Sequence, residues 1–196
     1  IDCATDARKV GIALATWNES TLILHEATCL GSWDAINETV ASWCTPGTLI
    51  ALDAPLGWPT PMSEVLVNHA AGAPIDTAPN ALFRRATDDF VTHHLGKRPL
   101  DVGADRIART AHRALALLGE LRARTGLDLP LAWHPGPLKA TSAIEVYPAA
   151  TLVARGLLST GYKGADGVPR RGELVSALRR ELTFTEDQAE AMRRSD

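Results

Sequence analysis

The sequence is poor in cysteine and has no long hydrophobic run. Its three cysteines, Cys3, Cys29 and Cys44, are odd in number and lie far from any CxxC spacing. This usage argues against a disulfide framework and a zinc site, and it favours a reducing compartment such as the cytoplasm. No apolar stretch approaches the roughly 18 residues of a membrane-spanning helix. We therefore expect a soluble cytoplasmic protein without a membrane partner.

Several common catalytic and nucleotide-binding motifs are also missing. The sequence has no GxGxxG, no GxxxxGK[ST] and no serine in a nucleophile-elbow pattern, so dinucleotide enzymes, P-loop enzymes and α/β-hydrolases lose their usual support. The six histidines show no HExxH spacing, which argues against a histidine zinc centre. Aromatic residues make up only 5% of the chain. They form no visible base-stacking platform, although Trp58 and Trp133 in expected loops are candidates.

Charge is divided unevenly along the chain. Residues 1–83 carry two basic against nine acidic side chains, a net charge of −7, whereas residues 84–196 carry eighteen against fourteen, a net charge of +4. The overall charge of −3 does not by itself indicate a nucleic-acid partner. The basic half could meet phosphates, or its arginines could be solvated or paired at i,i+4 along helices.

Hydrophobic periodicity predicts an α/β fold in which a β-meander is followed by a helical crossover to a buried strand. At 196 residues the chain has single-domain length. We expect one domain over residues 1–196, with a helical insertion over about 56–138. Strands are expected over residues 1–5, 10–17, 21–29, 48–53 and 142–147. Helices are expected over residues 32–43, 63–71, 81–95, 104–125, 149–158 and 171–182, and after a capping box of Thr185 and Gln188.

Three acidic residues, Asp2, Asp53 and Glu145, interrupt otherwise apolar strands. A carboxylate in a buried strand is costly unless it is paired, hydrogen-bonded or bound to a cation, so the three indicate a shared site. If the strands of Asp2 and Asp53 are neighbours, their backbones lie about 4.8 Å apart. That spacing suits carboxylates that bridge Mg²⁺ or Mn²⁺ ions. Alternatively, Asp53 caps the turn into Ala54-Pro55 and Glu145 pairs with an arginine.

The sequence resembles the family called "domain of unknown function four-two-nine" over nearly its whole length. The resemblance rests on IDCATDARKVGIALA at the start, the ALDAPLGWP loop, RATD at Arg85–Asp88, the IEVYPAA strand and GYKG at Gly161–Gly164. Members of that family are regarded as predicted nucleases of ribonuclease H-like fold. The resemblance therefore implies a five-stranded mixed sheet flanked by helices, and a metal-dependent attack of water on a phosphodiester.

The resemblance also assigns residues to that site. The family's acidic positions correspond to Asp2, Asp53 and Glu145, and its remaining polar motifs to Arg85, Thr87, Asp88 and Lys163. Ribonuclease H-like nucleases usually place one more acidic residue on a C-terminal helix, where Asp196 is the residue that remains in this sequence.

The leading hypothesis is a metal-dependent nuclease that acts on DNA or RNA. Asp2 and Asp53 would bind Mg²⁺ or Mn²⁺, with Glu145 and Asp196 as further ligands, and the metal would lower the pKa of the attacking water. Lys163 would stabilise the developing negative charge. The nucleic acid would be bound by Arg85, Asp88 and Arg106.

Two other functions are carried as alternatives. An ATP-dependent phosphotransferase of the sugar-kinase type would share the fold and an Asp-x-x-Thr hairpin, which Asp2–Thr5 matches loosely. However, the sequence lacks a glycine-rich adenosine loop and is too short for a two-lobed enzyme. The other alternative is a non-catalytic module that binds nucleic acid or protein through a degenerate site.

Overall fold

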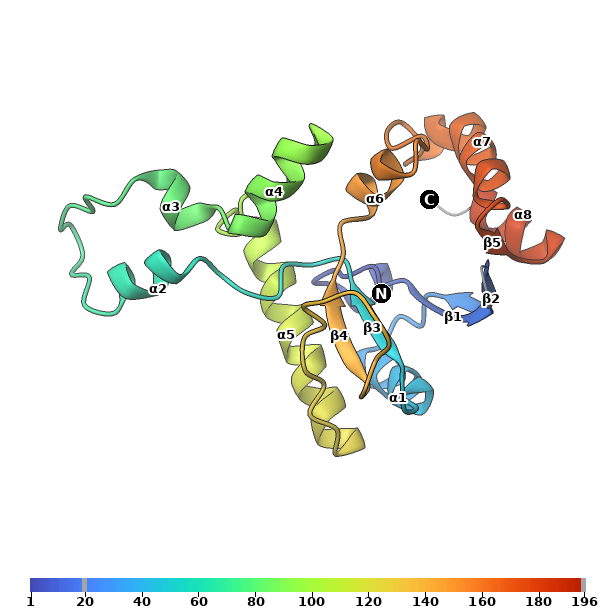
Figure 1. Ribbon diagram of the computed structural model, residues 1–196, viewed down its shortest axis with the longest axis horizontal. Coiled ribbons are helices and arrows are strands. Elements are labelled where there is room, and N and C mark those ends of the chain that lie inside the picture. The colour runs from blue at the N-terminus through green and yellow to red at the C-terminus, as the bar shows by residue number, and fades with distance from the viewer. Residues whose placement is uncertain (19–20, 195–196) are drawn as a thin grey trace.

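A computed structural model describes residues 1–18 and 21–194 as a mixed α/β structure with two small sheets (Figure 1). One sheet has the strand order β1-β2-β5, and the other pairs β3 with β4. The strands are β1 (Ile12–Asn18), β2 (Thr21–Thr28), β3 (Leu49–Leu52), β4 (Ser142–Glu145) and β5 (Leu182–Thr183). The α-helices are α1 (Trp33–Trp43), α2 (Thr60–Leu66), α3 (Pro79–Phe83), α4 (Ala86–Leu95), α5 (Asp105–Thr125), α6 (Pro148–Ala154), α7 (Val168–Leu178) and α8 (Glu186–Arg194). Two short 3₁₀ helices are η1 (Ala7–Lys9) and η2 (Ala165–Gly167).

The opening segment links the two sheets through a single residue. Asp2 forms an antiparallel bridge with Gly11, just before β1, and a parallel bridge with Asp53, just after β3. The Asp2 amide donates to the Gly11 carbonyl at 2.8 Å, and the Asp53 amide donates to the opening segment at 2.9 Å. The expected first strand is thus reduced to one bridged residue, because the chain turns into η1 a few residues later.

The expected α/β class is confirmed, but the expected continuous five-stranded sheet is not found in the described chain. The meander of β1 and β2 is antiparallel, and β3 and β4 are parallel, which agrees with a mixed arrangement of strands. Within residues 1–18 and 21–194, backbone pairing joins the two sets only through the bridges of Asp2. A single bridged residue contributes too few ladder hydrogen bonds to extend either sheet.

The main core lies where α1 and α5 pack against the strands. Leu117, Leu118 and Leu121 on one face of α5 are buried together with Ile36 of α1 and Leu52 of β3. Burial of each such leucine stabilises the fold by roughly 1.5–3 kcal/mol. The expected long helix is confirmed within one residue at its start, because apolar residues recur at spacings of three and four along it.

The helix expected over residues 81–95 is in fact two helices. The backbone of Arg84 and Arg85 is extended, and α4 begins after Arg85. The Asp88 carboxylate accepts a hydrogen bond from the Arg85 amide at 3.0 Å, which stabilises the start of α4. This break places Arg85 at a corner between α3 and α4.

In Figure 1, α2 and α3 extend away from the strands, and α6, α7 and α8 lie on the opposite side.

The C-terminal part of the described chain contains one unexpected strand. The helix expected to reach residue 182 ends at Leu178, because Leu182 and Thr183 pair in parallel with β2. The expected capping box is confirmed, since Thr185 and Gln188 exchange two hydrogen bonds of 2.8 and 3.2 Å. Along the described residues, we find no helix that combines the length and the apolar character needed to cross a membrane.

Candidate functional site

Asp2 and Asp53 are backbone neighbours whose side chains share one face. The parallel bridge pairs them directly, and paired residues on adjacent strands point to the same side. Asp2 is exposed and Asp53 is partly buried. Across residues 1–18 and 21–194, neither carboxylate forms an ion pair. The expected adjacency of these two residues is therefore confirmed, and it brings two like charges together without a paired cation.

The electrostatics of Asp53 reflect this arrangement. Burial and the charge of Asp2 raise the pKa of Asp53 from 3.8 to about 6, and the charge of Lys163 partly offsets the rise. Burial and the charge of Asp53 also raise the pKa of the Tyr147 phenol. A cation bound on this face would favour the ionised form of both carboxylates and lower the pKa of Asp53.

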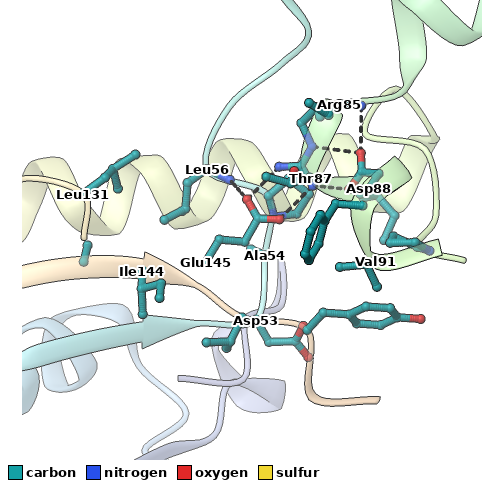
Figure 2. Close-up of a pocket in the computed structure, with 18 of the residues that line it drawn as sticks. Asp53, Ala54, Leu56, Arg85, Thr87, Asp88, Val91, Leu131, Ile144 and Glu145 are labelled. Carbon is teal, nitrogen blue, oxygen red and sulfur yellow. Dashed lines mark hydrogen bonds and ion pairs between the residues drawn. The ribbon is translucent and has the colours of Figure 1, made fainter. Parts of the chain in front are cut away.

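Glu145 points to the opposite face of the strands. It is the register partner of Leu52, the residue before Asp53, and successive residues of a strand point to opposite faces. In Figure 2, Glu145 reaches up toward Arg85 and the Leu56 amide, whereas Asp53 lies below it. The expected convergence of all three carboxylates does not occur. Nor does the described part of the chain place any three His, Cys, Asp or Glu side chains where they could hold a metal ion together.

Glu145 instead belongs to a charged cluster with Arg85 and Asp88. Arg85 binds Glu145 through two contacts of 2.6 and 2.7 Å and Asp88 through two contacts of 2.7 and 3.0 Å. The Leu56 amide donates to Glu145 at 2.9 Å. Burial alone would lower the pKa of Arg85, but the hydrogen bonds that it donates to both carboxylates raise it. The alternative expectation, that Glu145 pairs with an arginine, is therefore confirmed.

Lys163 lies on an exposed loop whose backbone carbonyls accept hydrogen bonds from Arg171. The buried Arg171 guanidinium donates to the carbonyls of Tyr162 and Gly164, both at 2.7 Å, on either side of Lys163. It also donates to the carbonyl of Arg193 at the end of α8, at 3.1 Å. Its second terminal nitrogen is buried without a hydrogen-bond partner. The loop that carries Lys163 is therefore tied to α7 and α8.

A glycine permits the close packing of this loop. A side-chain carbon built at Gly167 would lie 2.5 Å from the Tyr162 carbonyl carbon and 2.7 Å from its oxygen. Any other residue there would displace the chain just before Lys163.

A cleft of about 660 Å³ opens beside the charged cluster (Figure 2). Its walls come from the loop after β3, from α4 and α5, and from β4 and residues 131–133. Asp53 lies at one edge, and Arg85, Asp88 and Glu145 supply its charged end. Most of the remaining lining side chains are apolar or aromatic. This combination of apolar walls and a few polar groups is typical of a ligand site.

The remaining expected site residues are dispersed. Thr87 lines the cleft, whereas Arg106 is exposed near the start of α5 and is not among the lining residues. Asp196 lies outside the described residues. Sequence reasoning missed Tyr147 and Arg171. The tyrosine follows Glu145 by two residues in the IEVYP motif, which is a signal that it lies near the site, whereas Arg171 carries no such signal.

A family model described as "Protein of unknown function (DUF429)" matches residues 1–196. No curated protein matches the chain, and no solved structure does. The resemblance found in the sequence is therefore confirmed at the level of the family.

Proposed function

The chain belongs to this DUF429 family, and we propose that it is a divalent-metal-dependent nuclease that hydrolyses nucleic-acid phosphodiester bonds. The observation that carries the proposal is the pair of carboxylates at Asp2 and Asp53. They lie side by side on one face, and the pKa of Asp53 is raised first by burial and then by the charge of Asp2. A divalent cation is the simplest partner for two such groups.

The donor set of this pair fits Mg²⁺ or Mn²⁺. Both ions prefer oxygen ligands, and Mg²⁺ is commonly held by one or two carboxylates together with substrate phosphates rather than by a full protein cage. Asp2 and Asp53 would hold the ion. When bound, it would stabilise negative charge on the phosphate and lower the pKa of a nucleophilic water.

The surrounding residues support the same chemistry without contacting the ion. Lys163 is close enough to affect Asp53, so its ammonium group can also attract a phosphate to this face. Arg85 and Glu145 neutralise each other on the opposite face, where they orient the wall of the cleft. We therefore assign Glu145 a positioning role rather than a ligand role.

The strand arrangement supports a ribonuclease H-like fold as part of the proposal. The two-residue β5 pairs in parallel with the outer edge of β2. Without it, and counted through the bridges of Asp2, the order runs from β2 to β1, to the opening segment, to β3 and to β4. The first two steps are antiparallel and the last two are parallel. This order agrees with the mixed five-stranded arrangement that the family resemblance implies, and the free cysteines agree with a cytoplasmic location.

The decisive experiment is a calorimetric titration of Mn²⁺ into wild type, Asp53→Asn and Asp2→Asn, followed by cleavage assays on single-stranded and duplex substrates. We expect both variants to lose metal binding and to lower the cleavage rate by at least about a hundredfold, because the ion supplies several kcal/mol of charge stabilisation. The matched control is Asp34→Asn, whose side chain is 92% exposed on α1. Wild type that takes up no Mn²⁺, or Asp53→Asn that cleaves at the wild-type rate, would refute the proposal.

A non-catalytic nucleic-acid-binding module is the second candidate. The Arg85–Glu145 ion pair favours it, because it removes one of the three expected carboxylates from the metal face. Asp53→Asn separates the two functions. If the chain is a binding module, Asp53→Asn should bind nucleic acid as tightly as the wild type or more tightly, because it has lost a negative charge. Neither the wild type nor the variant would then cleave the nucleic acid.

A further inference from the structure

Two aromatic side chains stand exposed at the walls of the cleft. Phe90 of α4 is 62% exposed and Trp133 is 73% exposed, and both line the cleft. Single exposed apolar side chains are common on protein surfaces, but apolar side chains gathered at one cleft mark a candidate binding site. Their position on one cleft indicates that they contact a ligand with a flat or apolar face.

The charges inside the cleft restrict the kind of ligand. Asp53, Asp88 and Glu145 line it together with Arg85 as the opposing cation, so the interior has an excess of negative charge. An anionic group such as a phosphate or a fatty-acid carboxylate would be repelled from this end. A neutral ring with hydrogen-bonding edges would not be repelled. The Thr87 hydroxyl, which also lines the cleft, can donate a hydrogen bond to such a ring or accept one from it.

Cationic residues instead lie next to lining residues along the chain. Lys97 and Arg98 immediately precede Pro99 and Leu100, which line the cleft, and Arg106 lies one helical turn before the lining residue Thr110. In the part of the chain that the structure describes, none of these three cations forms an ion pair. These cations can therefore attract the phosphates of a chain from which a neutral group enters the cleft.

From this arrangement we infer that the cleft receives an unpaired nucleobase of a single-stranded nucleic acid, stacked against Trp133 and Phe90. The inference rests on the proposed nuclease function and specifies its substrate class. The cleft volume of about 660 Å³ lies within the range of about 300–1,000 Å³ typical of small-ligand sites. A duplex keeps its bases stacked inside the helix, so only an unpaired or extruded base can enter.

The test measures binding in EDTA, where no metal contributes. The probe is a fluorescently labelled oligothymidylate of about eight nucleotides, a length within known single-strand site sizes, compared with a blunt duplex of equal length. We expect the single strand to bind about tenfold more tightly than the duplex, and Trp133→Ala and Phe90→Ala each to weaken single-strand binding about tenfold. The matched control is Trp17→Ala, because Trp17 is 66% exposed but lies on β1 outside the cleft.

Three results would overturn the inference: equal binding of duplex and single strand, unchanged binding by both cleft variants, or an equal loss in Trp17→Ala. A fourth contrary result would come from binding of an apolar fluorescent dye to the protein. If Trp133→Ala abolishes dye binding but the oligothymidylate does not displace the dye from the wild type, the cleft binds apolar small molecules instead of a nucleobase.

Cleavage assays with Mn²⁺ separate this inference from the proposed function. Binding of the single strand without any cleavage would refute the nuclease and leave the cleft assignment intact. Metal-dependent cleavage with an unchanged KM in Trp133→Ala would refute the cleft assignment and leave the nuclease intact.

Discussion

The Arg85 guanidinium binds both oxygens of Glu145, at 2.6 and 2.7 Å, across sixty residues of sequence. The arginine is 13% exposed, and it binds Asp88, which is 8% exposed, at the same time. Arg85→Met keeps most of the side-chain volume but leaves two carboxylates without their cation. We expect it to lower the free energy of unfolding by about 3 kcal/mol, as measured by urea denaturation.

Arg109→Met is the control for this change. Arg109 and Asp105 also pair at 2.7 Å, but their side chains are 74% and 76% exposed. An exposed pair contributes less than about 1 kcal/mol, so the control should unfold almost like the wild type. Equal destabilisation by the two substitutions would mean that the buried cluster contributes no more to the free energy of unfolding than an exposed ion pair does.

Asp53 should make the stability of the metal-free protein depend on pH. Its pKa is about 6 in the folded protein and 3.8 ordinarily, so between these values the folded state holds a proton that the unfolded state has lost. The contribution of Asp53 to stability is therefore largest below about pH 4 and is lost as the pH rises through about 6.

Asp53→Asn removes this titration. Relative to wild type in EDTA, the variant should gain unfolding free energy between about pH 4 and about pH 7, on the order of 1 kcal/mol after solvent screening. Urea denaturation across this range measures the difference. A difference that does not change with pH would show that Asp53 titrates normally.

Arg171 should matter far more for stability than its neighbour Arg170. Arg171 is buried and donates to three backbone carbonyls, whereas Arg170 is exposed and makes one contact of 3.4 Å. Arg171→Met should cost about 3 kcal/mol, because it removes three hydrogen bonds donated by a buried charged group. Limited proteolysis should then cut the loop around Lys163 first, while Arg170→Met should leave stability and cleavage pattern unchanged.

The cysteines should differ in reactivity. Burial raises the pKa of the Cys3 thiol to about 11, and burial also raises that of Cys44, whereas Cys29 is exposed. A thiol-specific disulfide reagent near neutral pH attacks the thiolate, so we expect one fast phase from Cys29 and two slow ones. Persistence of the fast phase in Cys29→Ser would contradict the structure.

Most elements were predictable because they depend on local pattern, whereas the pairing of Asp2 with Asp53 was expected only if their strands are neighbours. An apolar run fixes where β3 lies, and the polar residue at its end marks the edge of the sheet. The capping box at Thr185 and the apolar face of α5 are similarly encoded within a few residues. These signals do not depend on the rest of the fold.

The features that sequence reasoning missed depend on distant contacts. The face on which Glu145 points is set by the register of β4 against β3, and a shift of one residue would reverse it. The break before α4 occurs in a stretch without proline or glycine, at Arg84 and Arg85, and Arg85 there binds a glutamate far along the chain. The role of Arg171 depends on carbonyls contributed by a loop and by α8, which no local pattern reveals.

Asp53 and Glu145 point to opposite faces of the β3–β4 pair, so the strands separate their two carboxylates. The charge of Glu145 affects the pKa of Asp53 less than burial, Asp2 or Lys163 does. Substitutions at the charged end of the cleft, away from Asp53 at its edge, should therefore have little effect on the ionisation of the acidic pair.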